Sequence, residues 1–249
     1  MNDNTDITNE LKEIHEKLTD LLLELTAFCD RNNIKYSLAF GSLIGAIRHK
    51  GFVPWDDDID IAMDRANYDK FVALVKKSKK YDFHRVHWLR SFRRVNESIS
   101  IDVFPFDSVP DNKIIAKIKL LLIKILQGMT DKKENLSKLS PFYRLAVRVT
   151  ALIGKPFKLS TKQKLYDRVS LIGNGKRTKQ ISCYHGPFAY LDKYYKHNLF
   201  DNLIQVDFEN HKFNAVKDYD LFLRKYYGDY MIPPAKSKRK NFHKQNHCQ

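Results

Sequence analysis

The sequence predicts an α+β protein, with helices and strands in mixed order along the chain. Some segments repeat their apolar residues every three or four positions, as helices do, and others alternate apolar with polar residues, as strands do. Gly, Asn and Pro residues separate these segments. Of the 249 residues, 43% are hydrophobic, which is enough to bury a sizeable core.

The N-terminal part begins with a long amphipathic helix. Leu11, Leu18 and Leu25 belong to an apolar stripe with a spacing of three and four, and acidic residues lie in its first turns, where the helix dipole favours them. A strand follows and enters the dipeptide Gly41-Ser42, which predicts a turn before a short helix. The expected elements are, in order, a helix over 11–29, a strand over 34–40, a helix over 43–49, a strand over 58–63 and a helix over 65–80.

The rest of the chain continues this alternation. Residues 81–96 have the composition of edge strands, and residues 99–103 alternate as a strand that ends at Phe104-Pro105. Gly228 follows a helical pattern and predicts its end. The further expected elements are helices over 114–126, 142–153 and 162–172, strands and loops over 181–208, and a helix over 219–227.

Charge divides the chain into three parts. The net charge is +15, but residues 1–111 carry 16 basic and 19 acidic side chains, residues 112–179 carry 17 and 3, and residues 180–249 carry 11 and 7. We therefore expect an acidic core over 1–111, a basic helical insertion over 112–179, and a C-terminal part over 180–249 that completes the domain and ends in a basic tail. The helices of the insertion either lie at an anionic membrane surface or pack against the core and expose their lysines.

The composition indicates a protein of a reducing compartment without an export signal. Cys29, Cys183 and Cys248 are far apart and form no CxxC motif, so neither a disulfide framework nor a four-ligand zinc site is expected. The N-terminus is polar and acidic, unlike a secretory signal. The longest apolar-rich stretch, residues 114–126, contains three lysines and is too short to span a bilayer. We expect a cytoplasmic protein, either soluble or peripheral on the inner face of the membrane.

The most informative feature is an acidic run, because four of the five residues from 56 to 60 are aspartates. These side chains would repel one another in a folded core, so their crowding favours a bound divalent cation. Alternate residues of a strand share one face, so Asp58 and Asp60 can hold the same metal ion, and Asp56 could join them. A solvated acidic turn after Pro54 is the alternative. The apolar residues directly after the acids favour the metal.

Two further features point to the same site. The Gly41-Ser42 turn leaves amide groups exposed at the start of a helix, where they can hold phosphate oxygens. Asp102 lies on the polar face of the strand over 99–103 and supplies a third carboxylate. A structural aspartate held by hydrogen bonds is the alternative for Asp102. Together these residues indicate a site for a metal ion and phosphate.

Three motifs resemble the LicD family of phosphotransferases, which includes phosphorylcholine transferases and the fukutin-related proteins. The first motif is GSLIGAIRHKGFVPWDDDIDIAMDRANYDKF, the second is IDVFPFDSVP, and the third is HKF followed by KDYDLFLRKYYGDYMIPP. Matches lie in order over residues 11–111 and 205–243, with a weak match between them. The resemblance implies a nucleotidyltransferase-like catalytic core over 1–111, with a small mixed sheet flanked by helices.

The resemblance also implies roles for individual residues. Asp58, Asp60 and Asp102 would be the catalytic residues and would hold Mg²⁺ or Mn²⁺, with Asp56 as a possible further ligand. Other residues would bind the phosphates of the donor and neutralise their charge. These phosphate-binding residues are Gly41, Ser42, Arg48 and Lys50.

The implied reaction is a Mg²⁺-dependent phosphotransfer. The expected enzyme moves a phospho-alcohol onto a cell-surface glycan such as teichoic acid, capsule or lipopolysaccharide. The first candidate for the phospho-alcohol is phosphocholine, with CDP-choline as its donor. Its partners would be CDP-choline or a related CDP-alcohol, and a glycan or lipid-linked glycan. A nucleotidyltransferase that moves NMP to an acceptor is the nearest alternative, because the same acids and the same turn serve that reaction.

A non-catalytic RNA-binding module is a more distant alternative. The pI of 9.6 and the basic middle segment would suit RNA. Such a module gives no reason for Asp58, Asp60 and Asp102, and the motif lies in the part of the chain that is net acidic. We therefore expect no specific nucleic-acid partner. For the basic insertion, a peripheral contact with an anionic membrane remains one alternative, and packing against the core is the other.

Overall fold

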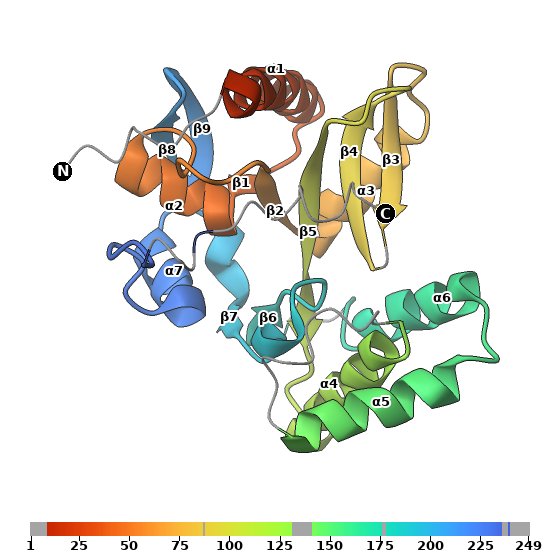
Figure 1. The fold of residues 1–249 in the computed structure, drawn as a ribbon. Helices are drawn as coiled ribbons and strands as arrows, with labels where there is room; N and C mark the ends of the chain where they lie inside the picture. The colour runs from red at the N-terminus through yellow and green to blue at the C-terminus, as the bar shows by residue number, and fades with distance from the viewer. Residues whose placement is uncertain (1–8, 87, 131–140, 176–177, 236–238, 240–249) are drawn as a thin grey trace. The chain divides into compact units, whose positions relative to one another are not determined.

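The computed structural model has the α+β fold that the sequence predicts, and its chain divides into two compact units (Figure 1). The residues that the structure describes are 9–86, 88–130, 141–175, 178–235 and 239. The first unit comprises Met1–His84, Arg90–Pro105 and Asn198–Gln249, and the second comprises Arg85–Leu89 and Phe106–His197.

The helices and strands follow one another with short connections. The elements within the first unit are α1 (Asn9–Arg31), β1 (Ser37–Leu38), α2 (Phe40–His49), β2 (Asp60–Asp64), α3 (Arg65–Val75), β8 (Leu203–Phe208), β9 (His211–Val216) and α7 (Tyr219–Tyr227). Those within the second are α4 (Lys113–Gly128), α5 (Pro141–Gly154), α6 (Leu159–Ser170), β6 (Gln180–Ser182), the 3-10 helix η2 (Phe188–Tyr190) and β7 (Tyr194–Lys196). The elements with residues in both units are β3 (Tyr81–Val86), β4 (Leu89–Arg94), β5 (Ser100–Val109) and the 3-10 helix η3 (His197–Phe200).

In the first unit the strands follow the order β1-β2-β5-β4-β3. β1 is antiparallel to β2, with Ser37 opposite Ala62, and β4 is antiparallel to β5, with Ser91 opposite Asp102. Between β2 and β5, the Asp102 N–H donates to the Ile59 carbonyl over 2.9 Å. The two segments that carry the acidic residues are therefore neighbours in one sheet.

Aromatic rings join the helices of the first unit to its strands. Phe28 of α1 lies edge-on to Phe71 of α3, with ring centroids 5.7 Å apart, and Phe71 contacts Phe92 of β4 at 5.6 Å. Each such pair contributes about 0.5–1.5 kcal/mol beyond the apolar area that it buries. The leucines of the predicted α1 stripe are buried, whereas Ile14 and Phe28 are half-buried, and this confirms the first helix and its inward face.

Three expected elements near the acidic run have different boundaries in the structure. The strand expected over 34–40 is limited to β1, because Phe40 has a φ of 45° in the left-handed region and α2 begins there. Gly41 and Ser42 consequently lie in the first turn of α2, and not in a turn before it. β2 begins at Asp60 and not at Asp58.

Two further boundaries differ from expectation. β5 does not end at Phe104-Pro105 but continues to Val109, because its last residues pair with β6, with Asp107 opposite Ser182. That partner is distant in the sequence, so the local pattern could not reveal it. The helix expected over 65–80 ends at Val75, after which residues 76–78 form turns.

The second unit contains three helices within a few residues of the expected positions. Its apolar cluster consists of Val109, Ile123, Leu126, Tyr166, Tyr184 and Leu191. Lys119 of α4 is fully buried, and its ammonium group donates to the carbonyls of Ser108 (2.7 Å) and Ile172 (2.9 Å). These bonds offset the cost of removing a charge from water. No helix in the described part of the chain combines the length and the apolar character needed to cross a bilayer.

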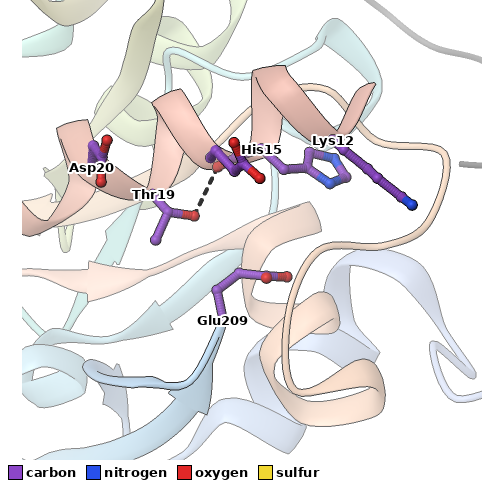
Figure 2. A pocket seen from close by; sticks show the side chains of 6 residues that line it. Lys12, His15, Thr19, Asp20 and Glu209 are labelled. Carbon is purple, nitrogen blue, oxygen red and sulfur yellow. Dashed lines mark hydrogen bonds between the residues drawn. The ribbon is translucent and has the colours of Figure 1, made fainter. Parts of the chain in front are cut away.

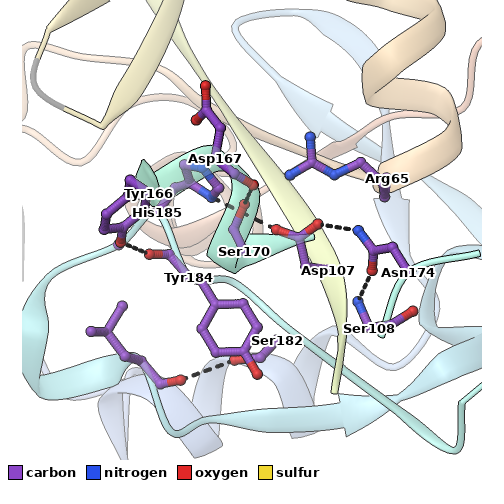
Figure 3. Close-up of polar contacts among 12 residues, drawn as sticks. Arg65, Asp107, Ser108, Tyr166, Asp167, Ser170, Asn174, Ser182, Tyr184 and His185 are labelled. Atoms are coloured by element: carbon purple, nitrogen blue, oxygen red, sulfur yellow. Dashed lines mark hydrogen bonds and ion pairs between the residues drawn. The ribbon is translucent and has the colours of Figure 1, made fainter. Parts of the chain in front are cut away.

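A buried polar cluster surrounds Asp107 in the second unit (Figure 3). The Asn174 side-chain amide donates to Asp107 Oδ1 over 2.7 Å, and Asn174 Oδ1 accepts from the Ser108 N–H over 2.7 Å. His185 Nδ1 lies 3.9 Å from Asp107 Oδ2. Asp107, Asn174 and His185 are called the Asp107 cluster below. The buried Asp107 carboxylate thus has a hydrogen-bond donor, as buried polar groups usually have.

Candidate active site

The acidic run enters β2 with alternating exposure. Asp56, Asp58 and Asp60 are half-buried, whereas the residues between them, Asp57 and Ile59, are buried. This alternation begins before β2 itself, so Asp56 and Asp58 share the side of the chain on which Asp60 lies. The alternation of side chains that is typical of a strand therefore begins before the first residue of β2 that pairs with a neighbouring strand.

β5 brings Asp102 to the same place. The charge of Asp102 acts on Asp60, and the Ser91 hydroxyl on the neighbouring strand β4 donates to Asp102 Oδ1 over 2.5 Å. One oxygen of Asp102 is thus held by a hydrogen bond, as the structural alternative for this residue expected. The charge of Asp102 nevertheless acts on Asp60. Asp56, Asp58, Asp60 and Asp102 are called the acid cluster below.

Mutual repulsion is the main electrostatic property of the acid cluster. Burial, followed by the charges of Asp58 and Asp102, raises the pKa of Asp60 well above its ordinary value. Burial and the charge of Asp58 raise the pKa of Asp56 in the same way, and the two side chains share a hydrogen bond. A hydrogen bond between two carboxyl groups requires a proton on one of them. Crowded carboxylates of this kind take up either protons or a cation.

Gly41 permits this crowding. A Cβ atom on Gly41 would lie 2.6 Å from Asp56 Oδ2 and 3.8 Å from Asp60 Oδ2, so a side chain at this position would displace the Asp56 carboxylate. The Gly41 N–H donates to the Asp60 carboxylate, which partly offsets the rise in the pKa of Asp60. The first turn of α2 therefore directs an amide toward the acid cluster.

Ser42 fixes the position of β2. Its Oγ accepts a hydrogen bond from the Asp60 N–H over 2.8 Å, and the side chain is buried. Gly41 and Ser42, two of the four residues expected to bind phosphate, are thus both beside Asp60, one through its backbone amide and one through its hydroxyl group. The structure brings Gly41, Ser42 and the acid cluster together.

The two expected basic residues lie at the end of α2. Arg48 Nη1 donates to the Tyr230 carbonyl (2.7 Å), and the Arg48 guanidinium is 6.0 Å from the ring centroid of Trp55. Lys50 is exposed and ends α2 in a left-handed conformation with a φ of 60°. The pKa of Asp207 on β8 is lowered by Lys212 and, to a smaller extent, by Lys50.

Trp55, between the basic residues and the acids, is faced by two guanidinium groups. Besides Arg48, Arg239 lies 4.3 Å from the centroid of its ring. The Trp55 side chain is half-buried and faces both cations. Arg239 belongs to the basic tail, of which residues 236–238 and 240–249 lie outside the described residues.

His15, which the motif analysis did not select, holds the loop that carries Asp56. Its Nε2 donates to the Asp56 carbonyl over 2.7 Å, and its ring stacks on Phe52 with centroids 3.8 Å apart. Burial lowers the pKa of His15. The available signal was its spacing, because His15 stands four residues after Leu11 on the buried stripe of α1.

Glu209 holds the start of the same loop. Glu209 and Asn210 have φ values of 48° and 61° and form the two-residue turn of the β8–β9 hairpin. Glu209 Oε1 accepts from the Phe52 N–H (3.0 Å), and the Glu209 N–H donates to the Lys50 carbonyl (2.9 Å). The loop between α2 and β2 is therefore anchored by the hairpin at one end and by α1 at the other.

A cavity of about 370 Å³ opens between these two anchors (Figure 2). It lies within the first unit, and its walls come from one face of α1 and from the hairpin turn. The lining residues are Lys12, His15, Glu16, Thr19, Asp20 and Glu209. Since His15 also contacts the Asp56 carbonyl, the cavity adjoins the backbone side of the acid cluster.

A divalent cation fits the acid cluster by its chemistry. Carboxylate oxygens are the ligands that Mg²⁺ prefers, and a bound cation would relieve the repulsion that, together with burial, raises the pKa of Asp56 and of Asp60. As the side chains stand, no group of three or more His, Cys, Asp or Glu residues among the described residues is arranged to hold a metal ion. Binding would therefore require side-chain rotations of these aspartates.

Comparison with known proteins identifies the family. The family model described as LicD/FKTN/FKRP, nucleotidyltransferase domain, matches residues 33–150. The lipopolysaccharide cholinephosphotransferase LicD of Haemophilus influenzae is 31% identical over 88% of this chain and 90% of that protein. The chain belongs to the LicD family. The resemblance found in the sequence motifs is thereby confirmed.

Other relatives match the chain over shorter stretches. An uncharacterised protein of Rickettsia typhi is 34% identical over 31% of this chain and 21% of that protein. Another, from Rickettsia prowazekii, is 43% identical over 21% of this chain and 16% of that protein. In this chain, the range of the LicD family model includes the acid cluster and α4, whereas His15 and Glu209 lie outside it.

Proposed function

We propose that this LicD-family protein transfers phosphocholine from CDP-choline to a cell-surface glycan. The observation that carries the proposal is the acid cluster, in which neighbouring strands hold carboxylates against one another beside the first turn of a helix. The similarity to a lipopolysaccharide cholinephosphotransferase over most of both chains supports the choice of head group and acceptor. Teichoic acid and capsule are further acceptors of the same chemical class.

The proposed reaction is an in-line displacement at phosphorus. A hydroxyl oxygen of the acceptor forms a bond to the phosphorus of the phosphocholine group, the bond from this phosphorus to the bridging oxygen of the diphosphate breaks, and CMP leaves. The hydroxyl proton passes to Asp102 or to water. The protein has little covalent chemistry to perform in such a transfer, so its residues mainly position the reactants and balance charge.

Mg²⁺ or Mn²⁺ would be held by Asp58 and Asp60, with Asp102 and Asp56 as further ligands. When bound, the ion would offset the charge on the transferred phosphoryl group and on the leaving CMP. The Gly41 amide keeps Asp60 in place, and the Ser42 hydroxyl keeps β2 in register with α2. Both residues would therefore border the phosphates of the donor.

Arg48 and Lys50 would supply positive charge at the far end of α2. The Arg48 guanidinium already lies near Trp55, so an aromatic ring and a cation are available together beside the acidic run. Such a pair suits a nucleoside diphosphate, because the ring can stack on the base while the guanidinium contacts phosphate. We assign the CMP half of the donor to this side.

The proposed setting is the cytoplasm, at the inner face of the membrane. A lipid-linked glycan presents its acceptor hydroxyl there, whereas CDP-choline is a soluble donor. Transfer of NMP to an acceptor is a second candidate, because the family model itself describes a nucleotidyltransferase domain. The two reactions differ in the part of the donor that stays on the acceptor.

The decisive experiment incubates the purified protein with Mg²⁺ and a panel of CDP-alcohols, with and without candidate glycans. We expect CMP release that depends on the glycan. Mass spectrometry of the glycan product should show the added phospho-alcohol. Asp58→Ala and Asp60→Ala, alone and together, should abolish transfer while the protein stays folded. Normal turnover of CDP-choline by the double variant, or a nucleotide on the product, would contradict the proposal.

A further inference from the structure

Helix α4 exposes an apolar face to solvent. Ile114, Ile118 and Leu121 have 70%, 51% and 57% of their surface exposed, and their spacing of four and three places them on one side of the helix. The opposite side carries Ile123 and Leu126, which belong to the buried cluster of the second unit. Helix α4 therefore has two apolar faces, one packed in the core of the second unit and one exposed.

Helix α5 repeats the same pattern. Leu145, Val149 and Leu152 have exposed fractions of 62%, 45% and 60%, and their spacing is again four and three. Each of these residues stands 31 positions after its counterpart on α4. Large exposed apolar surfaces of this kind usually mark an interaction site.

In both helices, basic residues directly precede the first two residues of the exposed apolar stripe. On α4, Lys113 and Lys117 are exposed and lie next to the apolar stripe; on α5, Arg144 and Arg148 occupy the corresponding positions. Neither helix contains an acidic residue, and the segment 112–179 has 17 basic and 3 acidic side chains in all. Each helix thus has an exposed aliphatic stripe with basic residues beside it.

The two helices are held together as one support. Gly128 at the end of α4 approaches α5 so closely that a Cβ there would lie 2.2 Å from Thr150 Oγ1. Lys162 of α6 donates to the carbonyls of Met129 (3.0 Å) and Gly154 (3.3 Å), at the ends of α4 and α5. A lysine at two helix ends satisfies carbonyls that have no partner within their helices.

We propose that the exposed faces of α4 and α5 dock onto an anionic lipid bilayer. The aliphatic side chains would enter the boundary between headgroups and acyl chains, and the adjacent lysine and arginine side chains would contact anionic headgroups. This is the contact that amphipathic interfacial helices make, and it requires no long-lived hydrogen bonds to a specific partner. It would place the first unit near lipid-linked substrates.

Charge and composition favour lipid over a protein occupant. A second copy would bring two strongly basic segments together, and their repulsion opposes such a dimer. Protein interfaces are enriched in aromatic residues and depleted in lysine, whereas the exposed stripes are made of Ile, Leu and Val and the stripe of α4 has lysines beside it. The occupant that matches both stripes is an anionic membrane surface.

The test is sedimentation of the full-length protein with vesicles of phosphatidylcholine alone or mixed with phosphatidylglycerol. We expect binding only to the anionic vesicles, and weaker binding when the salt rises from about 0.05 to 0.5 M. The assay contains neither donor nor acceptor, so its outcome is independent of the proposed transfer reaction. Binding that ignores lipid charge and salt would overturn the proposal.

Matched variants locate the contact. Leu121→Asn together with Leu152→Asn should lower the partition coefficient by at least about tenfold, and Lys113→Glu together with Lys117→Glu should do the same. Leu221→Asn is the control, because Leu221 on α7 is 55% exposed, like Leu121, but lies in the first unit. Wild-type binding by the Leu121 and Leu152 double variant would overturn the proposal.

A second measurement does not depend on removing apolar residues. Leu121→Trp should show a blue-shifted fluorescence increment on anionic vesicles and quenching by brominated lipid, and Leu221→Trp should show neither. If the wild type instead forms a dimer that Leu121→Asn dissociates, without binding lipid, the faces serve a second copy and the proposal is wrong. Circular dichroism and thermal unfolding confirm that each variant is folded.

Discussion

Asp102 and Asp107 lie on the same strand, β5, yet their carboxylates meet opposite surroundings. Asp107 accepts a hydrogen bond from the Asn174 amide and has the His185 ring nearby. Asp102 belongs to a group in which burial and neighbouring carboxylates raise the pKa of Asp60. The residue type is the same, but Asp107 accepts from an amide in a cluster without other carboxylates, whereas Asp102 accepts from Ser91 and adds its charge to a group of crowded carboxylates.

This difference distinguishes a structural acid from one that we propose to be functional. A buried carboxylate with donors around it contributes to the folded state, because its hydrogen bonds are retained there. Carboxylates that crowd one another cost stability until a proton or a cation reaches them. The Asp107 carboxylate therefore has a hydrogen-bond donor from the protein itself, whereas the acid cluster is suited to bind a cation.

The largest expected effect is on catalysis. Asp60→Asn keeps an acceptor for the Gly41 N–H but removes a charge from the acid cluster, so we expect transfer to fall by about 10³-fold. Asp107→Asn, the matched change on β5, should leave kcat within about threefold because Asp107 lies outside the acid cluster. CMP release from CDP-choline measures both. Equal losses in the two variants would remove the distinction between the clusters.

The second effect concerns the cation. After treatment with a chelator, Mn²⁺ at a concentration of 100 Kd should raise the free energy of unfolding of the wild type by about 2.7 kcal/mol, because only the folded state gathers the carboxylates. Asp107→Asn should respond equally, and Asp60→Asn should respond little. Urea unfolding with and without Mn²⁺ gives the values. A full response of Asp60→Asn would place the bound ion elsewhere.

The third effect tests the anchored loop between α2 and β2. His15→Phe keeps a ring on Phe52 but loses the donor to the Asp56 carbonyl, so we expect transfer and Mn²⁺ affinity to fall together by about tenfold. His15→Gln keeps a donor and should recover most of that loss. Mn²⁺ titration followed by electron paramagnetic resonance measures the affinity. Identical behaviour of the two variants would mean that the hydrogen bond does not position Asp56.

The smallest expected effect is on the free energy of unfolding, which should change in opposite directions in the two variants. Without a divalent cation, Asp60→Asn should raise the free energy of unfolding by about 1 kcal/mol because it relieves repulsion among carboxylates. Asp107→Asn should lower it by about 1 kcal/mol because a charge-assisted hydrogen bond is weakened. Urea unfolding in chelator measures both at neutral pH. A loss of stability in both variants would show that repulsion in the acid cluster is already compensated.

Much of the local structure followed from the sequence. The periodicity of α1, of the three helices between residues 113 and 170 and of α7 predicted these helices to within a few residues, because buried helical faces impose a spacing of three and four. The alternation of Asp58, Ile59 and Asp60 likewise predicted which side chains share a side. Local patterns succeed where each residue's environment depends on its near neighbours in the chain.

Long-range contacts explain the differences. β5 extends to Val109 because β6 pairs with it, and α2 begins at Phe40 because the backbone there turns to a positive φ while its ring packs on Phe104 and Phe222. The division of the sequence at residues 111 and 179 stays a prediction. The compact units of the structure place residues 106–111 with the helical part.

The sequence by itself determined the acidic motif, its family and the residue types suited to a metal ion and phosphate. Only the tertiary structure decided which acids meet and which residues hold them in place. Asp102 joins Asp60 through the pairing of strands, and His15 and Glu209 anchor the loop from segments far away in the chain. The physical reason is that charge repulsion and hydrogen bonding depend on distances in space, which a one-dimensional pattern does not contain.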